Sequence, residues 1–447
     1  MGRVASAALA AMLVVYPAVA SAQDDEKGSP VLAVSASGTV SLRDVVRMAV
    51  KSSPDHKVAE ARVARAEAES DLAAAGYLPR LDAAVRGGGS TERSTFLFRQ
   101  SQFVINSAHA EARGGAHWTV YDFGHTGNAV DAADAAHTAA ERGRDATHAG
   151  VARHAAELYV SVLFDEQLVL SKRTAVKHRT RFLAVAKGLV TQGVRPALDE
   201  ARAKVNLESA KHDLTAAEAR LALDRARLAV LIGMEPERLP SLAPAALPGA
   251  EEDGVRAASA SEKRPEVAEA VATVESQDQR VDSAWAAHLP RVEIDVAGSY
   301  RLTQYDYADQ LLPRAEASGM LSITVPLFDS SINARVDAAR ADLAAARARE
   351  EATRRHVRLE AYEAALQLKS ARALKARARE LSGTASSTLA VVDARYQQGL
   401  ATSLELVDAE QTDLEARETL LTAELRLQLA TVQVLAATGK VQSLEGS

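Results

Sequence analysis

The chain has no cysteine among its 447 residues, and this absence removes several kinds of protein at once. It excludes disulfide frameworks, thiolate metal sites and an acylated N-terminal cysteine, so membrane attachment would have to come from folded structure. Aromatic residues make up only 4% of the chain, which leaves little material for large globular cores. Charged residues reach 25% with a net charge of −6, and this mixed balance does not indicate nucleic-acid binding.

Long hydrophobic runs are also scarce. One short run over residues 4–19 follows Arg3 and precedes Ala20-Ser21-Ala22. This order predicts a secretory signal peptide over residues 1–22, with cleavage between Ala22 and Gln23. A retained anchor helix is the alternative, but the run is shorter than the roughly 20 apolar residues that a bilayer requires and contains a proline. No later run is long and apolar enough to cross a bilayer as a helix.

Motifs for catalysis are missing as well. The eleven histidines include no pair spaced three or four residues apart, the spacing that places two ligands on one helix face. No phosphate-binding glycine-rich loop, nucleophile elbow or pair of catalytic acids emerges. We therefore predict no catalytic residue, no metal site and no cofactor, and we expect that the chain is not an enzyme.

What the sequence does contain is a duplication. Four marker residues recur at an offset of 211 or 206 residues: Pro54/Pro265, Pro79/Pro290, Gly193/Gly399 and Gly233/Gly439. Offsets this constant indicate two copies of one structural unit. Several prolines between the copies indicate a linker. We expect this order: signal peptide 1–22, N-terminal extension 23–40, first repeat 41–233 with a hairpin at about 80–122, linker 234–264, second repeat 265–440 with a hairpin at about 290–328, and tail 441–447.

The sequence pattern of each repeat predicts a helix, a strand hairpin, a very long helix, a glycine turn and a further helix. The expected helices span residues 54–77, 126–189 and 196–232 in the first repeat, and 265–287, 331–397 and 402–438 in the second. Each long helix would extend on the order of 95–100 Å at 1.5 Å per residue. Leucines spaced by seven, such as Leu207 and Leu214, together with Ala210 and Ala217, predict close helix–helix packing. An isolated coiled-coil rod would explain these heptads but not the strands.

The segments between the helices alternate between apolar and polar residues, most clearly over 108–120, 292–303 and 317–327 and more weakly from Leu81. This pattern predicts four strands of about ten residues, the length of a tilted bilayer-crossing strand. A half-buried sheet of a soluble protein would show the same alternation. The export signal favours the membrane, where four strands cannot leave open edges. Closure then requires several chains, and three chains would supply roughly twelve strands.

Short motifs stand in matching order along the duplicated chain: Leu42-Arg43-Asp44-Val45-Val46, Ser53-Pro54, Leu78-Pro79, Tyr121-Asp122-Phe123-Gly124, Leu289-Pro290 and the two Gln-Gly turns. In this order and duplication, they resemble the outer membrane efflux protein (TolC-like) family. The resemblance covers about residues 41–440 and implies a mainly α-helical protein with a membrane β-barrel portion. It implies a homotrimer with a twelve-stranded barrel in the outer membrane of a Gram-negative-type cell and a twelve-helix tunnel in the periplasm. It also implies a periplasmic adaptor protein and an inner-membrane RND or ABC transporter as partners, and no nucleic acid.

The two glycine turns would form the periplasmic tip, where members of this family narrow and meet their adaptors. We expect adaptor docking at Gln192, Gly193 and Val194 and at Gln398, Gly399 and Leu400. The acids that follow would become rings of charge in a trimer and attract cations, although a solvated helix surface would carry such acids too. The family has a basic residue where this chain has Ala401, which leaves the geometry of a closing lock open. The candidate aperture and gating residues are Asp199, Tyr396, Glu405, Asp408 and Arg195.

The function that these features predict is an outer-membrane exit duct, which conducts substrates passively from an inner-membrane transporter. Either an efflux pump or a type I secretion system would suit such a duct, and the cargo stays open. A soluble periplasmic coiled-coil scaffold is the alternative of another class, and a periplasmic enzyme is a weaker one.

Overall fold

The computed structural model describes residues 39–96, 101–244, 247, 249–250, 253–306, 310–398 and 400–441. The predicted signal peptide, with Ala22 and Gln23, lies outside them. The chain divides into two compact units, each of which draws on both repeats. A sheet unit includes Ala68–Asp134 and Ser276–Leu343, and a helical unit contains Ala33–Glu67, Ala135–Glu275 and Ala344–Ser447.

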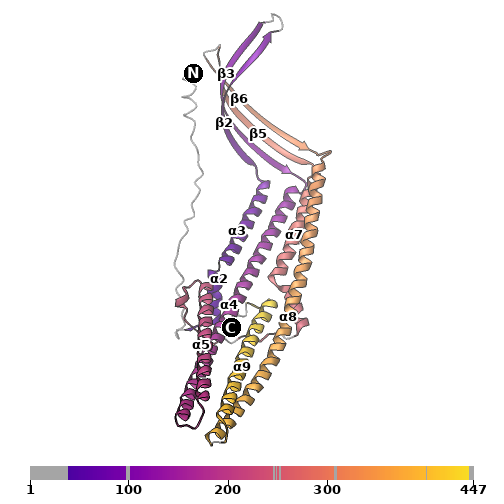
Figure 1. Cartoon of the computed structure of the whole chain (residues 1–447). Helices are drawn as coiled ribbons and strands as arrows, with labels where there is room; N and C mark the ends of the chain where they lie inside the picture. Colours follow the sequence, from indigo (N-terminus) through magenta and orange to yellow (C-terminus); the bar gives the residue numbers. More distant parts are fainter. Residues whose placement is uncertain are drawn as a thin grey trace. The chain divides into compact units, whose positions relative to one another are not determined.

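Four antiparallel strands form one sheet in the order β2-β3-β5-β6 (Figure 1). The strands are β2 Arg80–Phe96, β3 Ser101–Tyr121, β5 Arg291–Tyr305 and β6 Leu311–Thr324. The prediction of two strand hairpins is therefore confirmed. The predicted length of about ten residues is wrong, because the strands contain 17, 21, 15 and 14 residues.

The extra length of β2 and β3 does not alternate between apolar and polar residues, which explains why the alternation did not indicate it. The Oγ atoms of Ser90 and Ser107 lie 2.9 Å apart, and Thr91 donates a 2.8 Å hydrogen bond to Asn106. Asn106 in turn donates to Asp306 at 2.8 Å. Cross-strand pairs of this kind stabilise a sheet without any apolar face, so the ladder continues past the end of the apolar pattern.

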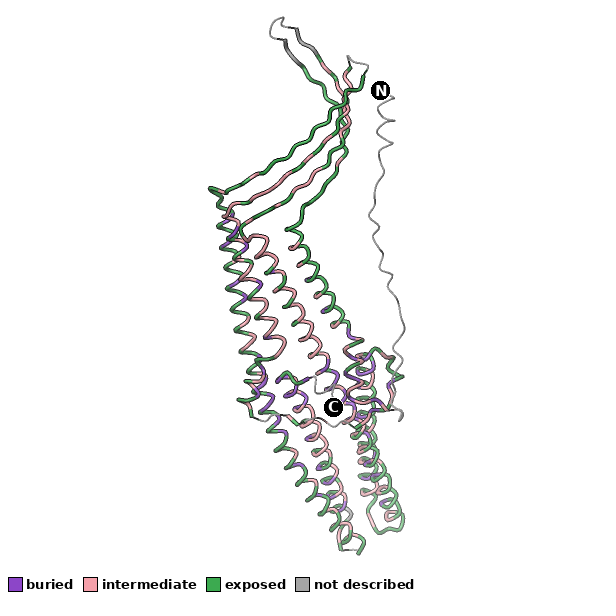
Figure 2. The backbone as a smooth tube through the Cα atoms, turned by 180° about the vertical axis from the view of Figure 1, so that it is seen from behind, coloured by how far each residue is buried: buried purple, intermediate pink, exposed green. Residues whose placement is uncertain are grey.

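The strand register gives the sheet one apolar and one charged face. Leu81 and Val85 of β2 share the apolar face with Tyr300 of β5 and Leu321 of β6. Leu81 is 77% exposed in the single chain, and Figure 2 shows that exposed residues prevail along the strands. Large apolar side chains gathered on one exposed face indicate a surface that meets a membrane or a partner.

The six predicted helices are confirmed, most of them within about three residues at each end. They are α3 Pro54–Ala74, α4 His125–Thr191, α5 Ala197–Leu231, α7 Pro265–Ala286, α8 Ser330–Gln397 and α9 Ser403–Ala437. The helix expected to reach Tyr77 finishes as the 3₁₀ turn η2, Ala75–Tyr77. The 67 residues of α4 and 68 residues of α8 give lengths of about 100 Å.

Two glycines of α4 mark close approaches and not breaks in the helix. A Cβ atom on Gly127 would lie 3.2 Å from the Tyr77 hydroxyl, and one on Gly143 would lie 3.1 Å from the Glu269 carboxylate. The helix continues through both positions. Glycine therefore permits neighbouring side chains to contact the backbone of α4 here.

Glycine also ends three helices in one recurring conformation. Gly193, Gly233 and Gly439 have φ angles of 70°, 76° and 72°, in the left-handed region that glycine adopts without a Cβ penalty. In each case the N–H of the next residue bonds a carbonyl five residues earlier, as Val194 does to Leu189 at 3.0 Å. This is the Schellman motif. Gly233 and Gly439 therefore recur in the duplication because they fulfil the same capping role.

The region between the repeats contains short elements that the sequence did not predict. They are η3 Pro236–Arg238, β4 Ser241–Leu242, α6 Gly254–Ala260 and η4 Ser261–Lys263. Strand β4 pairs in parallel with β1, Thr39–Val40. Strand β1 comes directly before helix α2, Leu42–Ser52. The fully buried Tyr159 of α4 donates hydrogen bonds to the Val40 and Ala243 carbonyls at 3.0 and 2.5 Å. Burial raises the pKa of this hydroxyl to about 12.

Tyr159 belongs to the main apolar core of the helical unit, which includes Val45, Val46, Leu228 and Val432. The core is small, but its residues come from α2, the linker and both repeats.

We expected no membrane-spanning helix in the mature chain. By length and composition alone one described segment, Leu404–Ala437 in α9, would qualify. Its alanines at seven-residue spacing, from Ala409 through Ala416 and Ala423 to Ala430, are all buried. This pattern is typical of a helix that packs closely against other helices.

Candidate functional site: a polar groove between the helical hairpins

Three charged residues of α4, Asp165, Lys172 and Arg179, lie seven residues apart and so share one helix face. We call them the charged stripe. Their side chains are mostly buried, with exposures of 1%, 18% and 6%. At an offset of 206 residues the second repeat has only buried alanines in α8: Ala371, Ala378 and Ala385. The two repeats therefore differ in charge at equivalent positions.

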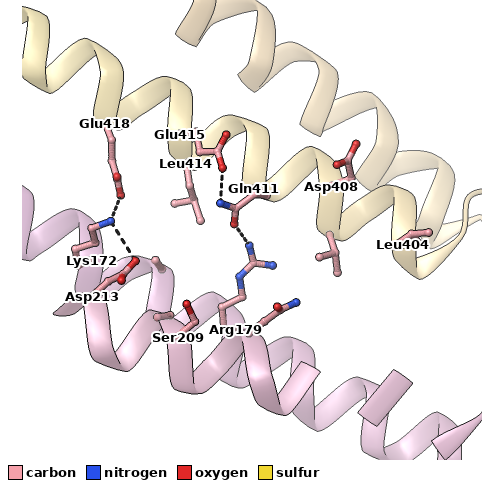
Figure 3. A pocket seen from close by; sticks show the side chains of 14 residues that line it. Lys172, Arg179, Ser209, Asp213, Leu404, Asp408, Gln411, Leu414, Glu415 and Glu418 are labelled. Carbon is pink, nitrogen blue, oxygen red and sulfur yellow. Dashed lines mark hydrogen bonds and ion pairs between the residues drawn. The ribbon is translucent and has the colours of Figure 1, made fainter. Parts of the chain in front are cut away.

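Two members of the charged stripe, Lys172 and Arg179, connect the hairpin α4–α5 to helix α9 of the hairpin α8–α9 (Figure 3). Lys172 Nζ lies 2.6 Å from a Glu418 carboxylate oxygen on α9 and 3.6 Å from Asp213 on α5. Arg179 donates a 2.6 Å hydrogen bond to the Gln411 side-chain carbonyl on α9.

These contacts cross a groove with a cavity volume of about 550 Å³, lined by α4, α5 and α9. Two cations line it together with four acids: Lys172 and Arg179, and Asp213, Asp408, Glu415 and Glu418. Its lining is therefore acidic overall. The side chain of Gln411 bridges the two signs, because it accepts from Arg179 and donates to Glu415 at 2.6 Å.

Burial perturbs the carboxyl groups around the stripe. It raises the pKa of Glu410, whose carboxylate lies 3.8 Å from Arg179, although the guanidinium acts in the opposite direction. Burial also raises the pKa of Asp165 to about 6; Arg220, at 3.0 Å, opposes this shift and Asp224 adds to it. Both carboxyl groups are thus held near positive charge at a desolvation cost.

This arrangement is suited to holding helices together and not to substrate chemistry. Removal of Arg179 would leave the mostly buried Glu410 carboxylate without its cation, which is destabilising. The stripe can therefore act as a polar connection between the two hairpins. Among the residues that the structure describes, no group of three or more His, Cys, Asp or Glu side chains could hold a metal ion.

The predicted aperture residue Glu405 has a structural role that we did not foresee. Thr402 precedes α9 as its N-cap, and the Glu405 carboxylate accepts a 2.6 Å hydrogen bond from the Thr402 N–H. The Thr402 hydroxyl accepts from the Glu405 N–H at 3.2 Å, which completes a capping box. The bond from the Thr402 backbone holds the pKa of Glu405 below its usual value. Glu405 thus stays ionised at the N-terminus of α9.

The other candidate aperture residues lie on separate elements. Asp199 is in the first turn of α5, and Arg195 lies in the turn before it. Asp408 lines the polar groove, whereas Tyr396 is near the end of α8 and half-buried. Within the described part of a single chain, no hydrogen bond joins Tyr396 to Asp199. The structure therefore brings only Asp408 into contact with the groove.

The expected docking residues lie in the turns between the paired helices. Gln192, Gly193 and Val194 are exposed after α4. In the second turn Gln398 and Leu400 are exposed as well, and the Leu400 N–H bonds the Arg395 carbonyl at 2.8 Å. Gly399 lies outside the described residues. Exposure leaves these turns accessible to a partner.

Sequence reasoning missed the charged stripe and Gln411. A signal for the stripe was present, because alignment of the repeats opposes three charges to three alanines. The prediction of the duplication used only matching prolines and glycines, so it did not include this difference in charge.

Comparison with known proteins agrees with this architecture. The family model described as outer membrane efflux protein matches residues 45–234 and 257–440. Protein CyaE of Bordetella pertussis is 25% identical over 407 residues, which cover 90% of this chain and 84% of CyaE. The Campylobacter jejuni CmeC outer membrane channel matches with a TM-score of 0.76 at 17% identity, over 89% of this chain and 85% of that one. The open-state MtrE outer membrane channel of Neisseria gonorrhoeae matches with a TM-score of 0.72 at 21% identity, over 89% of this chain and 88% of that one.

Proposed function

The chain belongs to the outer membrane efflux protein family and is an outer-membrane channel, and from this premise we propose that three copies form one exit duct. The sheet carries this proposal. Strands β2 and β6 are its two edges, and within the described chain neither has a partner strand on its outer side. A bilayer does not tolerate open edges, so β6 of one copy would pair with β2 of the next. Three copies would close a barrel of about twelve strands.

The two faces of the sheet support the same arrangement. The apolar face around Leu81 and Tyr300 suits lipid, and the face that carries Glu111 and Arg301 suits a water-filled lumen. The long helices would line a periplasmic tunnel. The exposed turns around Gly193 and Leu400 would meet a periplasmic adaptor, and an RND or ABC transporter in the inner membrane would supply the cargo.

The contacts of the charged stripe would suit a duct that opens by movement of the helical hairpins α4–α5 and α8–α9. Lys172 and Arg179 connect the hairpins through Glu418 and Gln411, so they would hold the closed arrangement. The acids of the tip, Asp199, Glu405 and Asp408, would form rings of charge where the duct narrows.

The test combines fractionation with a mass measurement. We expect the protein to remain in outer membranes until detergent is added, and the purified protein to have three times the chain mass by light scattering. A monomer in mild detergent would contradict the trimer. Release from the envelope without detergent would favour the soluble scaffold instead.

A further inference from the structure

The charged face of the sheet is not uniform, because arginines gather at one level of all four strands. Arg86 of β2 is the register partner of Glu111 of β3, which is the partner of Arg301 of β5, which is the partner of Arg314 of β6. One row across the sheet therefore holds three arginines and one glutamate.

The neighbouring row, two residues towards the helices, adds one charge of each sign. It contains Ala84, Arg113, Ser299 and Glu316 as successive register partners, and it lies about 7 Å from the first row. We call the six charged residues of the two rows the arginine belt: Arg86, Arg113, Arg301, Arg314, Glu111 and Glu316. The belt has four positive and two negative charges in each chain.

Two ion pairs order the belt without neutralising it. Arg301 lies 2.8 Å from Glu111 across the strands, and Arg314 lies 2.5 Å from Glu316 along β6. Arg86 and Arg113 bring two further positive charges near Glu111, whose carboxylate is already bonded to Arg301. An excess of positive charge therefore remains at this level.

The rows next to the belt offset only part of this excess of two positive charges, because Asp82 is the one acid in them. The row on the hairpin-end side holds Gly88, His109, Thr303 and Leu312, with no acid. The nearest acid on the same face of β2 is Asp82, one row beyond the belt on the helix side. The belt is therefore a distinct positive band along this face.

The opposite face at this level is apolar. Val85, Ala112, Tyr300 and Ala315 form the row between the two belt rows. In a membrane barrel the apolar face contacts lipid and the polar face lines the lumen. The belt would thus line the lumen of the barrel that the proposed function requires.

We propose that the arginine belt attracts and binds anionic groups, carboxylates or phosphates, of whatever passes through the barrel. This inference rests on the proposed trimeric duct, in which the belts of three chains would form one ring with an excess of positive charge. Guanidinium groups match carboxylate and phosphate oxygens in a two-point geometry. A lumen lined by one sign of charge focuses the field on passing ions. The duct would therefore favour anions at the barrel, in opposition to the acids at the tip.

The experiment measures reversal potentials of single channels in planar bilayers under a potassium chloride gradient. The variant carries Arg86→Gln, Arg301→Gln and Arg314→Gln. We expect its chloride-to-potassium permeability ratio to fall several-fold, because a change of about one kT in local potential alters the anion-to-cation ratio about sevenfold. The change should be larger in 0.1 M than in 1 M salt, where the Debye length is only about 3 Å.

A matched pair of single variants provides the control. Arg86→Gln and Arg93→Gln each remove one positive charge from β2, but position 93 lies on the opposite face of the strand. Only Arg86→Gln should lower the permeability ratio.

A triple variant that conducts with the reversal potential of the unmodified protein in 0.1 M salt would overturn the belt. An equal effect of Arg93→Gln would do so too. If the unmodified protein forms no channels, the proposed duct fails, which is a different outcome. Millimolar citrate should in addition reduce potassium current through the unmodified channel more than through the triple variant.

Discussion

At the scale of single residues, Asp165 illustrates how a buried charge can weaken a fold in which it has a partner. Its carboxyl is 1% exposed, and Arg220 is 3.0 Å away. Burial nevertheless raises its pKa from 3.8 to about 6. The folded state therefore binds the proton more tightly than the unfolded chain. Its contribution to stability is greatest below pH 4 and is lost as the pH rises through about 6.

We predict that Asp165→Asn stabilises the protein at pH 7.5, because the neutral amide avoids the cost of a buried charge. The gain should be on the order of 1–3 kcal/mol, since one pKa unit corresponds to about 1.4 kcal/mol, and it should disappear near pH 4. Thermal unfolding in detergent, followed by circular dichroism at both pH values, measures it. Asp213→Asn, which weakens an exposed contact with Lys172, should give no such gain. A loss of stability at pH 7.5 in Asp165→Asn would contradict this account.

Sequence reasoning was least successful in predicting the roles of single residues. It gave a hypothesis for the acids near the glycine turns from the resemblance, but it predicted neither the cap formed by Glu405 nor the stripe of Asp165, Lys172 and Arg179. Heptad spacing marks a position as facing a neighbour. It does not show which of several neighbouring helices supplies the partner, as α9 does for Lys172.

At the scale of elements, the beginning of α9 depends on the capping box of Thr402 and Glu405. We predict that Thr402→Ala weakens this end of the helix by about 1 kcal/mol. Faster hydrogen exchange of the first-turn amides of α9 would measure the loss. Thr412→Ala serves as the control, because the Thr412 hydroxyl bonds only the Asp408 carbonyl of its own helix and its removal should cost little. Equal effects at both positions would argue against the cap.

Helices were predicted better than strands for a physical reason. Pro265 marks the start of α7 and Gly439 marks the end of α9 in the sequence. Pro79 and Pro290 mark the starts of β2 and β5 in the same way, but the described residues at the other end of the β2–β3 hairpin include no such mark. Ser90 and Asn106 extend the ladder of β2 and β3 through polar pairs that resemble an ordinary loop.

At the scale of the whole molecule, the expected effect of the tip acids on ion selectivity can be separated from their effect on helix stability. We predict that Asp199→Asn, Glu405→Gln and Asp408→Asn together lower the cation preference of single channels. Glutamine at position 405 can still complete a capping box, so the helix should begin as before. Reversal potentials in a potassium chloride gradient measure the change, with Glu208→Gln, an exposed acid of α5 paired with Lys211, as the control. Unchanged selectivity in the triple variant would discard the rings of charge.

The charged stripe has a consequence for the symmetry of such an assembly. Around a closed ring of three chains, α4 and α8 would alternate, one with Asp165, Lys172 and Arg179 and the other with alanines at the same heights. Salt weakens ionic contacts, partly buried ones such as Lys172–Glu418 less than exposed ones, but leaves apolar packing in place. Concentrated salt would therefore loosen every second joint of the ring. The aperture would then widen with threefold symmetry. An opening with approximate sixfold symmetry would need a trigger other than salt.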